Sequence, residues 1–367
     1  MLYPVMPVYL KSIGFSIVLI GVLEGFAEAI AGLSKGYFGN LSDALGRRLP
    51  FVQIGYALSA VSKPMMAAFV YPLWIFFART LDRLGKGIRT GARDALLSDE
   101  ATPATKGQVF GFHRSMDTIG AVIGPLLAIV FLQIYPGAYH TLFLLAFLPG
   151  LLAIALTALI RENRHARKEN PGKPGFLDFI RYWRRSPAQY RRLAGGLLVF
   201  ALFNSSDVFL LLKAREAGWS DSAVIGVYVF YNLVYALAAY PLGALADRLG
   251  MKRVFAGGLI LFALVYAGMA FASAQPLFVA LFFLYGLYAA AKEGVAKAWI
   301  TNICEKKDTA TAIGTFTAFQ SICALIASSI AGVIWYSAGA AYTFLLSAVA
   351  TALVAAYVSR FKFQPPG

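Results

Sequence analysis

Cysteine, histidine and charged residues are all scarce in this chain of 367 residues. Its two cysteines, Cys304 and Cys323, offer no disulfide framework, and with only three scattered histidines there is no spacing typical of a metal site. The nucleotide-binding pattern G-x-x-x-x-G-K-S/T does not occur. These absences lead us to expect no metal, no cofactor, no nucleotide-driven process and no enzymatic activity.

Hydrophobic residues, in contrast, make up 59% of the chain, and its mean hydropathy is +0.66. Both values lie outside the range of a water-soluble protein of this length, so we predict an all-α integral membrane protein. A window of about 20 residues gives eleven spans, near residues 17–38, 51–70, 72–98, 108–133, 139–160, 193–213, 222–242, 254–273, 276–300, 309–335 and 340–359. The apolar stretch 1–10 would form only about 15 Å of helix against a core of about 30 Å. We therefore expect the chain to start inside the first of twelve helices.

Basic residues outnumber acidic ones by 33 to 18 and concentrate on one side of this topology. Lys11, Lys213 and Arg215 are the basic residues on the opposite side, which predicts that the C-terminus and the connection 161–192 are cytoplasmic. We expect a bacterial inner membrane protein that attracts anionic lipids at its cytoplasmic face. Nucleic-acid binding is disfavoured, because the basic residues are spread over several loops. The turn-rich connection predicts two bundles, 1–160 and 193–367, joined by a basic linker, 161–192, within which residues 176–185 form a short amphipathic helix on the membrane surface.

One predicted loop occurs in two similar copies, GNLSDALGRR at 39–48 and GALADRLGMKR at 243–253. The copies lie 204 residues apart and share a glycine, a leucine, an aspartate, a leucine and a glycine at matching positions. Each copy follows one apolar span and precedes another. The chain is therefore an internal duplication of a membrane bundle, which is a common construction of transporters.

The repeated loop resembles the pattern G-x-L-S/A-D-x-x-G-R-K/R of the major facilitator superfamily of secondary transporters. The first copy fills it with Gly39, Leu41, Ser42, Asp43, Gly46, Arg47 and Arg48, and the second copy supplies Gly243, Asp247, Arg248 and Gly250. The resemblance implies two pseudo-symmetric six-helix bundles in a monomer, and a loop that acts as a cytoplasmic latch with its aspartate facing a helix N-terminus. The alternative is a tight solvated turn that uses glycine for its backbone freedom.

A second resemblance lies in the span 108–133. Gly120, Gly124 and Pro125 match the G-x-x-x-G-P pattern of antiporters in this family, and the corresponding stretch 323–329 lacks it. This asymmetry favours export or exchange. Small residues four apart also support ordinary helix packing in membranes, which is the alternative.

The span 72–98 carries an unusual density of charge. One broad stripe of this span comprises Arg79, Asp82, Arg83, Lys86, Arg89 and Arg93. Because charges facing lipid are costly, we expect this stripe to line a cavity or to contact partners in the bundle. Arg83 with Gly87 resembles the family motif R-x-x-x-G, whose basic residue is linked to proton coupling, although Arg79 is an alternative. Toward the cytoplasmic end, snorkelling or loop contacts would suffice for Arg89, Arg93 and Asp94.

The offset of 204 relates the span 72–98 to the span 276–300, where it places Glu293 opposite Arg89 and Lys297 opposite Arg93. An ion pair between Arg89 and Glu293 is therefore one hypothesis. We predict a cytoplasmic gate that comprises the residues of the two loops together with Arg89, Arg93, Asp94, Lys292, Glu293 and Lys297.

Other polar residues within spans complete a predicted substrate and proton pathway. It comprises Glu24, Glu28, Arg79, Asp82, Arg83, His113, Asp117, Asn204 and Asp207. Asp207 interrupts an apolar span, and a lone acid at that depth is costly without a role. The alternative for Glu24 or Glu28 is to neutralise a basic residue of the charged stripe. Tyrosines such as Tyr231 and Tyr285 are weaker candidates for the walls of a binding site.

These patterns predict a secondary transporter that works by alternating access and moves a small molecule, with protons as coupling ions and efflux as the direction. Two alternatives stay open: an exchanger or exporter of an anionic metabolite, which the cationic stripe favours, and a non-transporting, truncated or receptor-like protein.

Overall fold

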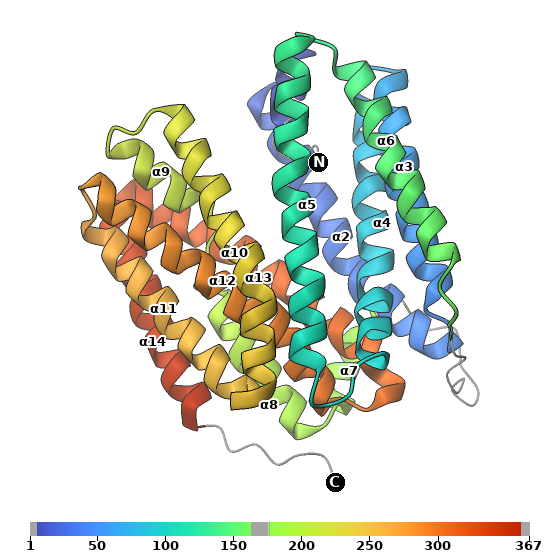
Figure 1. The fold of residues 1–367 in the computed structure, drawn as a ribbon, viewed down its shortest axis with the longest axis vertical. Coiled ribbons are helices and arrows are strands. Elements are labelled where there is room, and N and C mark those ends of the chain that lie inside the picture. Colours follow the sequence, from blue (N-terminus) through green and yellow to red (C-terminus); the bar gives the residue numbers. More distant parts are fainter. Residues whose placement is uncertain (1–5, 163–174, 176, 361–367) are drawn as a thin grey trace. The chain divides into compact units, whose positions relative to one another are not determined.

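The computed structural model describes residues 6–162, 175 and 177–360, and every regular element in this part is helical (Figure 1). In the first half the helices are α1 (Met6–Ser12), α2 (Ile17–Leu45), α3 (Leu49–Ala68), α4 (Pro72–Asp99), α5 (Lys106–Ile134) and α6 (Tyr139–Ala158). Then follow α7 (Asp178–Arg185), α8 (Ala188–Ala201), α9 (Val208–Glu216), α10 (Asp221–Leu249), α11 (Met251–Phe271), α12 (Gln275–Ile303), the 3₁₀ turn η1 (Lys306–Asp308), α13 (Thr309–Ala338) and α14 (Ala340–Arg360).

Seven helices in the described part are long and apolar enough to cross a membrane, namely α5, α6, α10, α11, α12, α13 and α14. The predicted span 72–98 falls on α4, which has the length but carries the charged stripe. The predicted span 193–213 falls on α8 and α9, which have 14 and 9 residues. The interruption of this span, between Ala201 and Val208, corrects the prediction of a continuous helix.

The local sequence contributes to the break between α8 and α9. Asn204, Ser205, Ser206 and Asp207 occupy it, and the short side chains of these residue types compete with helical hydrogen bonds. Ser206 illustrates this, because its hydroxyl accepts a hydrogen bond from the backbone nitrogen of Val208 and its own backbone nitrogen donates to Ser328 Oγ. Asn204 and Asp207, two residues of the predicted pathway, therefore lie in an unwound segment rather than on one face of a helix.

The chain divides into two compact units. Unit 1 comprises Met1–Leu96, Gly120–Arg185 and Glu305–Ser321, and unit 2 comprises Leu97–Ile119, Ser186–Cys304 and Ile322–Gly367. Most of the first half of the sequence is thus in unit 1, together with η1 and the start of α13. Unit 2 holds most of the second half, together with the start of α5.

In unit 1, α3 packs along α6, and a core cluster around Tyr9, Phe143 and Ile75 joins α1, α4 and α6. The helix predicted within 176–185 is present as α7. Its Phe179 is buried against Gly36 of α2 and Phe319 of α13, so this side chain faces protein. In unit 2, α11 packs on α12 and α14, and α10 packs on α12.

Candidate functional site

The two repeated segments, predicted as loops, are mostly helical, because α2 extends to Leu45 and α10 to Leu249. Their aspartates lie in the last turns of these helices, and each binds the first turn of another helix. In unit 1, Asp43 Oδ2 accepts hydrogen bonds from the backbone nitrogen of Thr311 at 2.7 Å and from its hydroxyl at 2.8 Å. In unit 2, Asp247 accepts hydrogen bonds from the backbone nitrogens of Gly107, at 2.8 Å, and Gln108, at 2.7 Å. A carboxylate is favourable there because the first backbone N–H groups of a helix lack partners and its dipole is positive at that end. Both aspartates therefore make the contact that the resemblance implies.

The first glycine of each repeated loop lies at a close helix crossing. A Cβ atom on Gly39 would clash with the backbone oxygen of Ala310 at the start of α13. A Cβ atom on Gly243 would clash with the backbone oxygen of Gly107 at the start of α5. Because both obstacles are backbone atoms, neither crossing accepts a side chain without a shift of a helix. The two loops thus hold their partner helices in the same way.

The second glycine of each loop makes the turn. Gly46 and Gly250 have φ angles of 63° and 96°, in the left-handed region that favours glycine. The chain then enters α3 at Arg48, which is 2% exposed and whose guanidinium lies 3.4 Å from Asp43 Oδ1 and 3.3 Å from the Lys306 carbonyl oxygen. The neighbouring basic residues Arg47 and Arg248 are exposed.

Asp43 is buried, although it lies beyond the predicted span 17–38. Burial raises the pKa of the Asp43 carboxyl to about 6, and the nearby Asp308 adds to this effect. The positive charge of Arg48 and the hydrogen bonds from Thr311 act in the opposite direction. The contact between α2 and α13 therefore contains an acid that titrates close to neutral pH.

Unit 1 also contains a network of buried charges centred on Asp82 of α4. Its carboxylate lies 2.6 Å from Lys63 Nζ of α3, 3.3 Å from Arg79 and 3.3 Å from Arg83. The side chains of Lys63, Arg79, Asp82 and Arg83 are between 4% and 19% exposed. Isolated charges at such depth are costly, so these four side chains depend on one another. Loss of a partner would leave a buried charge uncompensated.

Glu28 of α2 extends this network. Its carboxylate lies 2.9 Å from Arg83 and 4.0 Å from Lys86. The side chains of Glu28 and Lys86 are 46% and 44% exposed, so they form the open edge of the network. This is the neutralising role considered for Glu28. The side chain of Glu24 lies outside the described residues.

The C-terminal part of the charged stripe on α4 makes other contacts in unit 1. Arg89 donates a hydrogen bond of 2.9 Å to Ser59 Oγ and stacks on the Tyr56 ring at 4.6 Å. Arg93 lies 2.9 Å from the buried carboxylate of Asp94. The pair of Arg89 with Glu293 remains a prediction.

The unwound segment of unit 2 presents Asp207 to two tyrosines. Tyr231 of α10 donates a hydrogen bond to Asp207 Oδ2 at 2.6 Å, and Tyr285 of α12 donates one to Oδ1 at 2.5 Å. Tyr288 of α12 donates to Asn204 Oδ1 at 3.3 Å. Within the described ranges no lysine or arginine forms an ion pair with Asp207. Tyr231 and Tyr285, which the sequence offered only as weaker candidates for a binding site, thus bind Asp207, which it offered as a stronger one.

Lys292 follows Tyr288 by one turn of α12. Its ammonium group is 5.4 Å from the centre of the Phe200 ring and 5.9 Å from that of Tyr288, which are cation–π distances. Lys297, one turn and a half further on, is half-buried.

A second charged group of unit 2 surrounds Arg114 of α5. Arg114 lies 2.9 Å from Asp117 and 3.9 Å from Glu293 of α12, and it donates a hydrogen bond to the hydroxyl of Tyr235. His113 is half-buried beside it. Arg114 and Asp117 are three residues apart, a spacing that brings two side chains together on a helix.

The glycine and proline pattern of α5 lies in unit 1. Pro125 is inside the helix, and Gly124 is buried. A Cβ atom on Gly120 would meet no described atom within 4 Å. Packing in this structure therefore does not require glycine at position 120.

Comparisons with known proteins agree with this architecture. The family model of the Major Facilitator Superfamily matches residues 1–230 and 208–367. An uncharacterized MFS-type transporter of Methanocaldococcus jannaschii is 30% identical over 341 residues, which cover 91% of this chain and 84% of that protein. The chain belongs to the Major Facilitator Superfamily. It has the fold of this superfamily, an all-α membrane protein with twelve spans in two six-helix bundles, and it is a member of a family of transporters.

Further relatives of this superfamily member include the multidrug resistance protein MdtH of Yersinia enterocolitica, 24% identical over 284 residues that cover 76% of this chain and 68% of that protein. The crystal structure of the transporter FucP in the outward conformation has a TM-score of 0.74 at 16% identity, and covers 96% of this chain and 95% of that one. The crystal structure of the human organic anion transporter MFSD10 has a TM-score of 0.76 at 16% identity, with 95% and 87% covered.

Sequence reasoning missed Lys63 in this superfamily member. Lys63 is a lone basic residue within the predicted span 51–70, and a lone charge at that depth was itself a signal of a buried partner. Sequence reasoning also missed Tyr235 as a partner of Arg114, because nothing in the sequence distinguishes this tyrosine from the others.

Proposed function

We propose that this protein is a secondary active transporter that works by alternating access and exports a small molecule in exchange for protons. The observation that carries the proposal is Asp207, an acid in the unwound segment between α8 and α9 whose two oxygens are held by the hydroxyls of Tyr231 and Tyr285. Unwound helices near the middle of the membrane provide substrate and ion sites in transporters. This acid sits at a break in the helical backbone and is held by hydroxyl groups from two other helices, a placement that suits a site for a substrate or a coupling ion.

The contacts of the repeated loops support the alternating-access part of the proposal. Asp43 and Asp247 join their helices to others by a few hydrogen bonds at matched positions. Such contacts break and form again without unfolding either helix. We propose that they are the gate, that they lie on the cytoplasmic face of a bacterial plasma membrane, and that the protein works as a monomer. Two relatives are named as resistance proteins, the multidrug resistance protein MdtH and the quinolone resistance protein NorA of Staphylococcus aureus, which is 27% identical over 122 residues. These names support efflux as the direction of transport.

The proposed role of Asp207 is tested with the purified protein in liposomes that contain a pH-sensitive dye. Compounds are screened for proton release or uptake under an imposed pH gradient. Asp207→Asn should abolish proton movement coupled to the substrate while exchange of substrate across the membrane persists. Glu100→Gln, which changes an exposed acid of the loop after α4, is the matched control and should behave like the wild type. Unchanged proton coupling in Asp207→Asn would refute the role of Asp207.

A second candidate function is exchange or export of an anionic metabolite. The network in unit 1 favours it, because four cations, Lys63, Arg79, Arg83 and Lys86, face two carboxylates, those of Asp82 and Glu28. The excess of positive charge suits an anion at its open edge. Competition in the same liposomes distinguishes the candidates, because organic anions should inhibit transport if the substrate is an anion and lipophilic cations should inhibit it if the substrate is a cation.

A further inference from the structure

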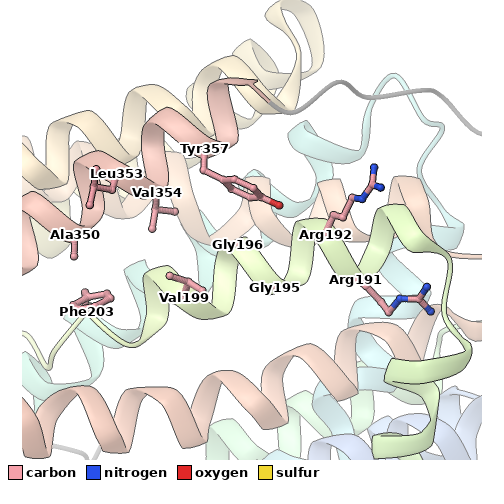
Figure 2. A pocket seen from close by; sticks show the side chains of 10 residues that line it. All are labelled: Arg191, Arg192, Gly195, Gly196, Val199, Phe203, Ala350, Leu353, Val354 and Tyr357. Atoms are coloured by element: carbon pink, nitrogen blue, oxygen red, sulfur yellow. The ribbon is translucent and has the colours of Figure 1, made fainter.

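A pocket of about 450 Å³ lies within unit 2, between α8 and the C-terminal half of α14. Figure 2 shows Arg191 and Arg192 at one end of it and Phe203 at the other. Val199 and Leu353 line the stretch between them. The ten residues that line the pocket include two arginines and no acid, and the remainder are apolar apart from the hydroxyl of Tyr357. We name this pocket the α8–α14 groove.

Two adjacent glycines open the groove. A Cβ atom on Gly195 would meet no atom within 4 Å, so the space above this residue is empty. A Cβ atom on Gly196 would lie 3.0 Å from a carbon of the Tyr357 ring, so glycine here lets the ring rest on α8. The apolar walls are open to the outside, since Val199 is 47% exposed and Leu353 is 68% exposed. In a membrane protein, surfaces of this kind face lipid.

The length and charge of the groove match one leaflet of a bilayer. From Arg192 to Phe203 the chain advances eleven residues, which is about 16 Å at the helical rise, close to half of a hydrocarbon core of about 30 Å. The arginines lie at the end that we predict to be cytoplasmic, where the membrane surface is negative. Arg191 is fixed by a hydrogen bond of 2.9 Å to the Ser186 carbonyl oxygen, and Arg192 is exposed.

We propose that the α8–α14 groove is a binding site for one anionic phospholipid of the cytoplasmic leaflet. The phosphate group binds Arg191 and Arg192, and one acyl chain lies over Gly195 along Val199 and Leu353 toward Phe203. The two arginines favour a negatively charged headgroup, and the empty volume over Gly195 accommodates an acyl chain. The proposal does not depend on the substrate, on the coupling ion or on the direction of transport.

Native mass spectrometry of the full-length protein in detergent tests the proposal, with dioleoylphosphatidylglycerol as the anionic lipid and dioleoylphosphatidylcholine as the neutral one. We expect one phosphatidylglycerol to bind in preference to phosphatidylcholine. Arg192→Gln should weaken this binding about fivefold, as expected for one basic residue at a lipid surface. Gly195→Leu should abolish it, because the new side chain enters the acyl site at a position where a Cβ atom meets no described atom within 4 Å.

Two matched variants serve as controls. Arg253→Gln removes an exposed arginine from the first turn of α11, and Gly257→Leu adds a side chain on α11 where a Cβ atom would also meet no atom within 4 Å. Both should retain the preferred lipid. A loss as large in the controls as in the groove variants, or equal binding of the two lipids, would overturn the proposal.

The other possible occupant is the end of the chain itself, since residues 361–367 follow α14. Deletion of these residues should leave lipid binding unchanged. If the lipid binds only after the deletion, the terminal segment is the occupant and the proposal is wrong. A thermal unfolding scan accompanies each variant, and should Gly195→Leu fail to fold, Arg192→Gln with its control still decides the outcome.

Discussion

Asp82 is the residue on which the charges of unit 1 depend. Its carboxylate is shared by Lys63, Arg79 and Arg83, each within 3.3 Å. Removing the acid leaves three cations facing one another with little access to water. Removing one cation leaves an acid that still has two partners. The two changes are therefore unequal, although each deletes the same ion pair.

We predict that Asp82→Asn lowers stability by about 3–5 kcal/mol, the usual cost of an uncompensated buried charge, and that Lys63→Met costs clearly less. The double variant should recover part of the loss, because it removes one of the cations left in excess. The measurement is the thermal unfolding midpoint of the purified protein in detergent. Equal midpoints for the two single variants would contradict the shared-acid arrangement.

At the same scale, the sequence predicted the charged stripe but not its partners. Helical periodicity placed Arg79, Asp82 and Arg83 on one face of α4, because neighbours along a helix are fixed by its geometry. The contact of Arg83 with Glu28 was foreseen only as one of several uses of that acid. Lys63 of α3 was not foreseen, since which residues of two helices meet depends on their packing, and no local pattern determines it.

The crossings at Gly39 and Gly243 matter at the scale of elements, because each brings two helix backbones into contact. Gly39→Ala and Gly243→Ala should each cost about 1–3 kcal/mol, as expected for an atom added to a tight site. The unfolding midpoint should fall in both variants. Gly120→Ala is the control on α5, where the added atom meets open space and should have little effect. A fall in Gly120→Ala alone would contradict our description of the crossings.

The break between α8 and α9 shows the limit of sequence reasoning about elements. Hydropathy located the span, and Asp207 stood out within it, but the local preference of the short polar residues does not by itself determine that the helix ends there. Asp207 gains two tyrosine hydroxyls in the unwound form. Those partners come from α10 and α12, so the gain that favours the break is tertiary and does not appear in a local pattern.

The contact of Asp43 with Thr311, which we propose to be part of the gate, gives a prediction for the whole molecule. In an open state its carboxyl meets water and returns to its ordinary pKa of 3.8, whereas burial holds it at about 6 in the closed contact. The closed contact therefore binds more protons between these values, and it weakens as pH rises through 6. From pH 5 to pH 7 the opening equilibrium should increase about tenfold, which corresponds to about 1.4 kcal/mol.

Hydrogen exchange of the Thr311 amide, corrected for the intrinsic pH dependence of exchange, measures this opening, because that amide donates to Asp43. Protection should decrease between pH 5 and pH 7. In Asp43→Asn the decrease should disappear, since an amide does not titrate. Persistence of the pH dependence in Asp43→Asn would assign it to another group, with Asp308 the nearest acid to examine.

The fold of the whole molecule was the most predictable level. Composition, span length and the repeated loop sufficed, because the bilayer fixes the length and polarity of every helix and duplication fixes their order. The composition of the two units was less predictable. That the start of α13 packs with α2, and the start of α5 with α10, follows from the contacts of Asp43 and Asp247, which only the structure displays.

The exchange of segments between the halves of the sequence has a consequence for biosynthesis. Asp43 and Thr311 are separated by 268 residues, so at about 5–20 residues per second the ribosome needs roughly 15 to 50 seconds to supply the partner of an aspartate already made. During that interval Asp43 of α2 lacks the helix N-terminus that it binds, and unit 1 lacks its last component. The first half of the chain must therefore wait in the membrane, inserted but incomplete, until the second half has been translated.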